Sequence, residues 1–409
     1  MKQSIMYYIS RAIMGLSFHM LFTAAGLYRI DIAQLEVYQL ILIGTALEIA
    51  IFTFEVPTGI VADLKSRKLS VIIGLFIISI GSILEALTPI FYIIFIAQVI
   101  WGFGYTFISG ALDAWVSDEI EPEKLEHTII TGSQIYQLAS VLGIILAAVI
   151  GLSNIRLALY VSGILTVLLG FISIVYMKET KKPNKHNEQK FFKNYYGQLI
   201  KGFSHIKNHK TLRIMFVIMI FFGLYSEGID RSYELHILDG LNFRQILDIA
   251  PIWILSIVNA SIAIFGYLML FVVKRYLDKS HYIYMWAFNF TMMMIVGILL
   301  FAYMPNVYFA LFGFIFFSIS RGGTYPLLNT ILLKNTPSNI KATVLSSFGQ
   351  LDAIGQLLSG GLMVLISLWY SIQGLYLITA LLLIVPLFGF IRLKKDNLKT
   401  IENNIYDKD

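Results

Sequence analysis

Twelve long apolar stretches follow one another along this chain, and several of them contain charged residues. The second stretch runs from Tyr38 to Pro57 and holds two carboxylates, Glu48 and Glu55. An α-helix rises about 1.5 Å per residue, so crossing ~30 Å of hydrocarbon takes roughly 20 apolar residues. A charged side chain near the centre of such a helix costs about 2.5–3.5 kcal/mol on insertion scales, and it generally faces a polar interior. The pattern therefore indicates a membrane protein with a polar path through it.

The composition excludes an ordinary soluble domain. Of the 409 residues, 57% are hydrophobic and only 14% are charged, and the mean hydropathy is +0.74. Soluble domains carry about 25% charged residues. Twelve spans leave short loops and one longer connector, with no room for a separate catalytic domain. The chain has no cysteine, which excludes disulfides, thiol catalysis and cysteine-ligated metals.

We expect an all-α integral membrane protein of twelve transmembrane helices in two six-helix bundles, residues 1–177 and 212–394. A polar cytoplasmic linker, 178–211, lies between them, and its segment 191–203 has the apolar spacing of a helix lying on the inner membrane face. Residues 395–409 are expected to form a cytoplasmic tail. The helices are expected near 5–29, 36–60, 69–88, 90–118, 127–151, 154–177, 212–239, 250–274, 281–303, 307–334, 341–368 and 370–393.

Lys and Arg are distributed unevenly between the two sets of loops. One set, which includes the linker and both termini, carries 25 of the 31 basic residues. The opposite set carries only Arg29, Arg156 and Arg244. Because basic loops stay in the cytoplasm, we expect a multi-pass protein of the cell inner (plasma) membrane with both termini cytoplasmic. Contact with membrane lipids explains the net charge of +6, and no nucleic-acid partner is expected.

The junction between the second and third expected helices carries Gly and charged residues at a defined spacing. It reads Glu55-Val-Pro-Thr-Gly59-Ile-Val-Ala-Asp63-Leu-Lys-Ser-Arg67-Lys68. This resembles the signature loop of the major facilitator superfamily, Gly-x-x-x-Asp-(Arg/Lys)-x-Gly-Arg-(Arg/Lys), with departures at Leu64 and Ser66. The Glu-x-Pro opening resembles the variant loop of drug/proton antiporters that include certain tetracycline efflux proteins. The resemblance implies the major facilitator fold, with two bundles around a central substrate site.

The charges of this junction suggest a gate. Asp63, at the end of the second helix, can accept hydrogen bonds from a neighbouring helix N-terminus, where the helix dipole favours an anion. Arg67 can pair with Asp118 at the end of the fourth helix. The alternative is a positive-inside loop with an incidental Asp. We expect a gating cluster formed by Gly59, Asp63, Arg67, Lys68 and Asp118.

Two further stretches match the superfamily in part. Gln98 occupies the Arg place of an Arg-x-x-Gln-Gly pattern. The run from Gly143 to Gly151 is rich in small residues where drug/proton antiporters show Gly-Pro and a double Gly, but it lacks the Pro. Close helix packing is the other explanation for these small residues.

Four titratable side chains of the first half are candidates to carry a coupled proton: Glu48, Glu55, Asp113 and His19. Glu48 and Glu55 are two turns apart on one helical face, and burial favours the neutral form of a carboxyl group. The resemblance implies that Asp113 faces the central cavity, which the first, fourth, seventh and tenth helices line in this superfamily. The structural alternatives are pairing of an acid with a buried cation and simple hydrogen bonding of His19.

Other charged residues are expected to neutralise these acids or to reach water. Arg11 is expected to pair with an acid on the second or fourth helix. Glu85 lies near the outer end of the third helix and is expected to extend to water, as are Glu234 and His236 at the end of the seventh helix.

The second half concentrates its charges on the seventh, tenth and eleventh helices. Glu227 and Arg231 are four residues apart and can pair along one face, with Asp230 close enough to join them. An Arg321–Asp352 pair would neutralise two charges at once. A self-contained structural ion pair is the alternative interpretation for the seventh helix. The residues expected to line the central cavity are Arg11, Gln98, Glu227, Asp230, Arg231, Arg321, Gln350 and Asp352.

These features favour a secondary active transporter rather than an enzyme. No P-loop, catalytic motif or paired metal-ligand pattern occurs, so we expect no cofactor, no metal and no catalytic residue. We expect a monomer that couples proton binding to efflux of an amphipathic organic compound by alternating access, with tetracycline-like antibiotics as the leading substrates. The alternatives are transport of a metabolite or lipid-linked sugar by the same fold, and a polytopic membrane enzyme or sensor, which the short loops disfavour.

Overall fold

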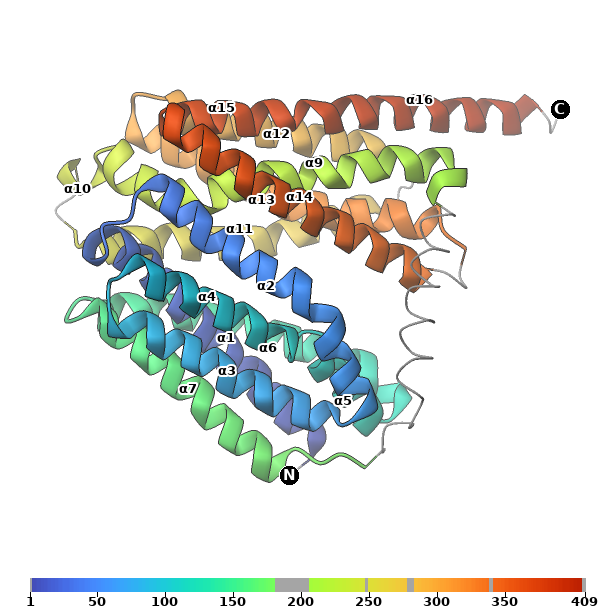
Figure 1. Ribbon diagram of the computed structural model, residues 1–409. Helices are drawn as coiled ribbons and strands as arrows, with labels where there is room; N and C mark the ends of the chain where they lie inside the picture. The colour runs from blue at the N-terminus through green and yellow to red at the C-terminus, as the bar shows by residue number, and fades with distance from the viewer. Residues whose placement is uncertain (1, 181–205, 247–248, 278–282, 338–340, 407–409) are drawn as a thin grey trace. The chain divides into compact units, whose positions relative to one another are not determined.

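The computed structural model describes residues 2–180, 206–246, 249–277, 283–337 and 341–406, and every regular element within them is helical (Figure 1). Twelve helices in these ranges are long and apolar enough to cross a membrane. This confirms the expected all-α, twelve-span architecture. The helix expected over 191–203 lies outside the described residues.

The chain divides into two compact units. Unit 1 comprises the described residues of Met1–Phe192 and Arg244–Ala260, and unit 2 those of Lys193–Phe243 and Ser261–Asp409. Residues 244–260, which the sequence places in the second half, therefore belong to unit 1. This segment contains most of α10 (Phe243–Ile246) and the first part of α11 (Pro251–Leu277).

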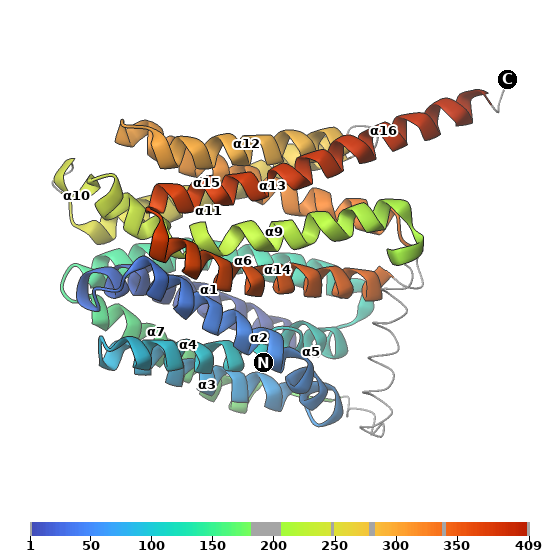
Figure 2. The ribbon, with the colours of Figure 1, turned by 45° about the horizontal axis from the view of Figure 1, so that its top comes forward.

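Unit 1 contains the first six membrane spans. Within it α1 packs against α6 and α7, α3 against α4 and α7, and α2 against α4 (Figures 1 and 2). The span expected at 90–118 is interrupted by a turn between α4 and α5. The next helix, α6, begins at Pro122, and the N–H that proline lacks would have no acceptor within the helix at this first position. The elements are α1 Gln3–Leu27, η1 Tyr28–Ile32, α2 Val37–Leu64, α3 Arg67–Leu87, α4 Phe91–Thr106, α5 Ala111–Glu119, α6 Pro122–Gly151 and α7 Ile155–Tyr176.

Unit 2 contains the later spans. Within it α9 packs against α14, α15 and α16, and α12 packs against α13, α15 and α16. The last helix extends to Tyr406, so most of the segment expected as a tail is helical. The elements are α9 Lys210–Leu235, η2 His236–Gly240, α12 Ile283–Tyr303, α13 Val307–Lys334, α14 Lys341–Trp369, α15 Ile372–Leu382 and α16 Ile384–Tyr406.

Glycines allow the closest helix crossings in both units. In unit 1 a Cβ on Gly15 of α1 would meet the backbone carbonyl of Tyr136, and one on Gly143 of α6 would meet that of Leu16. In unit 2 a Cβ on Gly223 of α9 would lie 2.8 Å from the Cα of Gly355 on α14. Small residues permit such backbone contact between membrane helices. Each unit thus uses glycines at the crossing of its first and fifth spans.

The first span of each unit ends in the same unusual turn. Tyr28–Ile32 and His236–Gly240 are π-helical. The backbone N–H of Ala33 donates to the Tyr28 carbonyl at 3.0 Å, and that of Leu241 donates to the His236 carbonyl at 2.8 Å. Each turn is followed by a residue with positive φ, 51° at Gln34 and 52° at Asn242. Polar residues such as these tolerate that conformation better than β-branched ones.

Candidate functional site

Arg67 is the centre of the charged junction between α2 and α3. Its guanidinium donates to the Asp118 carboxylate and, at 2.8 Å, to the backbone oxygen of Ala114, both on α5. Asp63 approaches it at 3.5 Å from the preceding turn of helix. The expected Arg67–Asp118 pair is confirmed. Arg67 therefore joins the loop to the end of the fourth span through two different acceptors.

Glu179 holds the other side of the same junction and was not singled out in the sequence. Its carboxylate accepts hydrogen bonds from the Ser66 hydroxyl at 2.5 Å and from the backbone N–H of Arg67 at 2.7 Å. A carboxylate at this place satisfies the unpaired N–H groups at the start of α3 and complements the helix dipole. The adjacent backbone is fixed as well, because Trp115 donates to the Lys178 carbonyl at 2.7 Å. The start of the linker is thus part of the junction.

The two remaining members of the predicted gating cluster lie at its edge. Lys68 donates from its ammonium to the Ile174 carbonyl of α7 at 2.9 Å. Gly59 is exposed on α2, with no atom within 4 Å of the position that a Cβ would occupy. All five predicted residues therefore lie in unit 1, and Arg67 contacts two of the others.

Arg11, Asp113 and Tyr7 form a hydrogen-bonded cluster between α1 and α5. Arg11 Nη2 donates to the Asp113 carboxylate at 2.9 Å and 3.2 Å, and Tyr7 Oη donates to the same carboxylate at 2.8 Å. Arg11 Nε donates to Tyr7 Oη at 3.0 Å. The expected partner of Arg11 is thus the acid of the fourth span. The buried Tyr7 orients both charged groups and was not predicted.

His19 lies one helical turn beyond Gly15 on α1. Its Nδ1 is 3.1 Å from the Gly15 carbonyl oxygen, so Nδ1 carries a hydrogen because a carbonyl only accepts. The ring meets Tyr136 edge-on, with centroids 5.6 Å apart. Nε2 is consequently the ring nitrogen that can take up a further proton.

Aromatic side chains from α1 and α4 form a wall in unit 1. Trp101 stacks on Tyr105 with centroids 5.5 Å apart, and Phe18 and Phe22 meet the Trp101 ring edge-on at 5.2 Å and 4.9 Å. The indole N–H of Trp101 is buried and has no hydrogen-bond partner among the described residues. Trp101 and Phe18 are each 4% exposed, so the open ring surface of this wall belongs to Tyr105 and Phe22.

The two acids of the second span lie on α2, where Glu48 is half-buried and Glu55 is exposed. Tyr105 interacts electrostatically with both glutamates and with Arg11 and Asp113. The acids predicted on the second and fourth spans therefore share one region of unit 1 with the aromatic wall.

Glu85 corrects one expectation. It does not extend to water: it is 0% exposed, and it accepts hydrogen bonds from Arg29 Nε at 2.7 Å and from Gln98 Nε2 at 2.6 Å. Gln98 is itself buried, at 2% exposure. A buried carboxylate is tolerated when a cation and a neutral donor satisfy both of its oxygens. The triad ties α3 to α4 and to η1, the turn that ends the first span.

Arg321 corrects a second expectation, because its partner is Asp230 and not Asp352. Arg321 Nη1 of α13 donates to Asp230 Oδ1 of α9 at 2.5 Å. The guanidinium also lies over the Tyr225 ring, 5.6 Å from its centroid. Glu227 and Arg231 pair along α9 at 3.1 Å, as predicted. Arg231 of α9 and Arg321 of α13 are thus each paired with a different acid of α9.

Asp352 lies on α14. Its Oδ2 accepts from Gln356 Nε2 at 3.0 Å, whereas Oδ1 is buried without a hydrogen-bond partner among the described residues. Electrostatic interactions connect it to Arg321, Asp230 and Glu227. Gln350, one half-turn earlier, is half-buried. Asp352 is therefore a carboxyl group within a membrane span, and protonation of Oδ1 would turn this oxygen into a hydrogen-bond donor.

His236 corrects a third expectation, because it is buried at 1% exposure and not solvated. Its Nε2 lies 3.0 Å from the Phe301 carbonyl, and its ring meets Phe301 and Tyr376 edge-on. In unit 1, Arg244 donates to both oxygens of Asp31 at 2.9 Å and 2.5 Å, a forked pair that sequence reasoning also missed. It attaches residues 244–260 to the turn after the first span.

Comparison with known proteins places these arrangements in a family. The chain is 23% identical over 407 residues to the MFS-type transporter YxaM of Bacillus subtilis (strain 168), covering 96% of each protein. A variant of the nucleoside transporter NupG has a similar fold, with a TM-score of 0.80, 16% identity, and coverage of 95% of this chain and 99% of that one. A POT family transporter in complex with 5-aminolevulinic acid also has a similar fold, with a TM-score of 0.73 and 13% identity. The match covers 97% of this chain and 96% of that one. A profile of the family matches residues 6–360, and the chain belongs to the Major Facilitator Superfamily.

Proposed function

We propose that this transporter couples proton movement to export of a planar, amphipathic organic compound. Membership of the superfamily supports transport, and the direction, the proton and the substrate class are our proposal. The proposed mechanism is alternating access, in which proton binding changes the relative stability of the conformations. The proposed location is the cell inner membrane with both termini cytoplasmic, supported by the 25 basic residues of one loop set against three of the other.

The observation that carries proton coupling is the environment of Asp352. Its Oδ1 is buried without a partner among the described residues, and the nearest arginine of α13 is already bonded to Asp230. Among the described residues, Gln356 donates to Oδ2 and no group donates to Oδ1, so a proton on Oδ1 would offset the cost of burying that oxygen. A conformation that supplies a donor or water to Oδ1 would release the proton. Glu48, Glu55, Asp113 and His19 remain proposed as further coupling groups.

The aromatic walls support the substrate class. In unit 1 the partly exposed ring of Tyr105, stacked on the buried Trp101, lies in the region of two carboxylates on α2. A flat ring bearing a cationic or polar group would stack on such surface and interact with the acids. Tetracycline-like antibiotics are the first compounds to test. The alternative is a metabolite such as a nucleoside, whose base would stack equally well, and the likeness to NupG supports including it.

The test uses everted membrane vesicles in which a pH gradient drives accumulation of externally added compounds. We expect accumulation of tetracycline or ethidium by the natural protein, abolished by a protonophore, and none by Asp352→Asn. Glu126→Gln, a change at an exposed acid of α6, is the matched control and should behave like the natural protein. Accumulation that survives the protonophore contradicts proton coupling. If nucleosides are transported and tetracycline and ethidium are not, the alternative of a metabolite transporter holds and export of amphipathic drugs is contradicted.

A further inference from the structure

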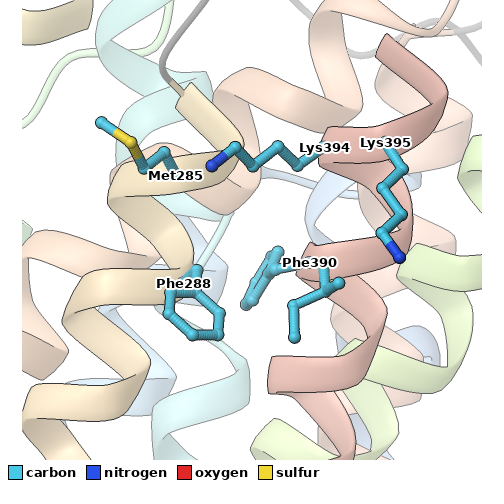
Figure 3. Close-up of a pocket in the computed structure, with 6 residues that line it drawn as sticks. Met285, Phe288, Phe390, Lys394 and Lys395 are labelled. Carbon is cyan, nitrogen blue, oxygen red and sulfur yellow. The ribbon is translucent and has the colours of Figure 1, made fainter. Parts of the chain in front are cut away.

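A cavity of about 380 Å³ lies between α12 and α16 of unit 2. Figure 3 shows the rings of Phe288 and Phe390 facing the space between the two helices, and Lys394 extending from α16 above them toward Met285 on α12. Lys395 leaves α16 on the other side in this view. The volume is within the ~300–1,000 Å³ range of sites for small ligands. The lining residues are Met285, Phe288, Phe390, Ile391, Lys394 and Lys395.

The cavity lies where two membrane spans end. In the sequence the apolar run of α12 follows the polar segment 274–280, so Met285 and Phe288 lie near the start of this span. The apolar run of α16 ends in the sequence at the charged residues Lys394, Lys395 and Asp396. The apolar residues therefore face the edge of the hydrocarbon layer, and the two ammonium groups lie at the level of the lipid headgroups. Long lysine side chains at a helix end reach that level while their stems cover apolar surface.

The two lysines have no ion-pair partner among the described residues, and both are exposed. In contrast to the exposed lysines, the side chain of Phe390, one turn earlier on α16, is buried at 0% exposure. The site thus combines unneutralised positive charge with an apolar hollow directly below it. A phospholipid has the complementary arrangement, with an anionic phosphate above an acyl chain.

We propose that this cavity binds an anionic phospholipid, with the phosphate at Lys394 and one acyl chain against Phe288 and Phe390, while Lys395 adds positive charge from the other side of α16. Basic pockets between membrane helices bind acidic headgroups, because each lysine near the surface is attracted to their negative charge. A zwitterionic lipid carries its own ammonium group and gains less. The expected preference for an anionic lipid is on the order of fivefold per lysine. This site is separate from the acids proposed for coupling, and its test requires no transport.

The absence of natural cysteine makes a direct test possible. Met285→Cys introduces a single thiol in the cavity, which is labelled with bimane, and the protein is reconstituted in phosphatidylcholine vesicles. An equal small fraction of brominated phosphatidylglycerol or brominated phosphatidylcholine is then added, with bromine on the acyl chain as a contact quencher. We expect several-fold stronger quenching by the phosphatidylglycerol. Native mass spectrometry of the unlabelled protein with the same two lipids provides an independent measurement of the preference.

The variants separate this site from general surface charge. Lys394→Gln combined with Lys395→Gln should reduce the preference for phosphatidylglycerol to near one. Arg392→Gln removes an exposed charge from the same helix outside the cavity lining and should leave the preference unchanged. Equal quenching by the two lipids would overturn the proposal, because the cavity would then accept any acyl chain. A preference that persists in the double variant, or that Arg392→Gln also abolishes, would place the headgroup elsewhere and would equally overturn it.

Discussion

The Glu179 carboxylate accepts a hydrogen bond from the backbone N–H of Arg67 at 2.7 Å, across 112 positions of sequence. The side chain of the same Arg67 bonds to Asp118 and to the Ala114 carbonyl. Backbone and side chain of one residue are therefore held by two different segments. The first residues of the linker therefore contact the loop between α2 and α3 and fix the start of α3.

We expect Glu179→Ala to lower stability by about 1 kcal/mol, the typical cost of losing a helix N-cap. It should also lower the transport rate, because the junction loses the acceptor that fixes Arg67. Thermal unfolding in detergent and vesicle uptake measure the two effects. Glu126→Ala removes an exposed acid of α6 and is the matched control. Equal losses in the two variants would indicate that only net charge matters.

Asp63→Asn should slow transport while leaving substrate affinity within a few fold. Asp63 is 3.5 Å from Arg67 and 43% exposed, so its removal shifts a conformational equilibrium without unfolding the junction. Equilibrium binding of the substrate and single-turnover exchange distinguish the two quantities. Collapsed affinity with an unchanged exchange rate would contradict a gating role.

Glu48→Gln and Asp352→Asn imitate protonated side chains with little change in shape. A carboxyl group that carries the coupled proton should, once neutralised, abolish uptake driven by a pH gradient yet permit substrate exchange at equal pH. We expect this behaviour from Asp352→Asn, whose Oδ1 has no partner among the described residues. If Glu48→Gln shows it as well, both acids take part. A Glu48 held ionised by a buried cation would instead give reduced folded yield on substitution.

Gly223→Ala should destabilise unit 2 by about 1–3 kcal/mol, the usual cost of overpacking. The new Cβ would lie 2.8 Å from the Gly355 Cα and 2.9 Å from the Gln356 nitrogen, and backbone atoms cannot rotate away. Gly349→Ala on the facing helix α14 meets nothing within 4 Å and is the control. Its stability should be unchanged or slightly raised, because Ala favours helix. Thermal unfolding of the two variants side by side gives the comparison.

Single cysteines at Lys185, Asn242 and Asn306 test the topology, since the chain has no natural thiol. An impermeant maleimide applied to intact cells should label positions 242 and 306, on the loop set with three basic residues, and not 185. Permeabilised cells provide the control that all three thiols react. Labelling at 185 alone would reverse the orientation.

The sequence predicted what local spacing determines. Helical periodicity pairs Glu227 with Arg231, and the distances of Arg67 and Asp118 from their helix ends bring those two residues to one side of the membrane. The twelve spans follow from their length and apolarity, which do not depend on how helices pack. These predictions needed no knowledge of helix rotation.

Predictions that depended on helix rotation were less accurate. Arg321 could reach either α9 or α14, and only the packed structure selects Asp230. Glu85 and His236 lie near the ends of their spans, but neighbouring helices bury both. Glu179 lies in the segment that the sequence predicts only to be a polar linker. A usable signal was its place in Lys178-Glu-Thr180, directly after an apolar helix and on the same side of the membrane as the start of α3.

The π-helical turns at the ends of the first and seventh spans resemble each other in detail. Tyr28–Gln34 and His236–Asn242 share the π-turn, the aspartate at the fourth position and the positive-φ amide residue at the seventh. π-Helices account for well under 1% of residues in proteins, so two copies at the ends of corresponding spans are difficult to attribute to independent invention. Duplication of an ancestral segment that included this span and turn would account for both. In the first half, Asp31 of this turn binds Arg244 through a forked pair.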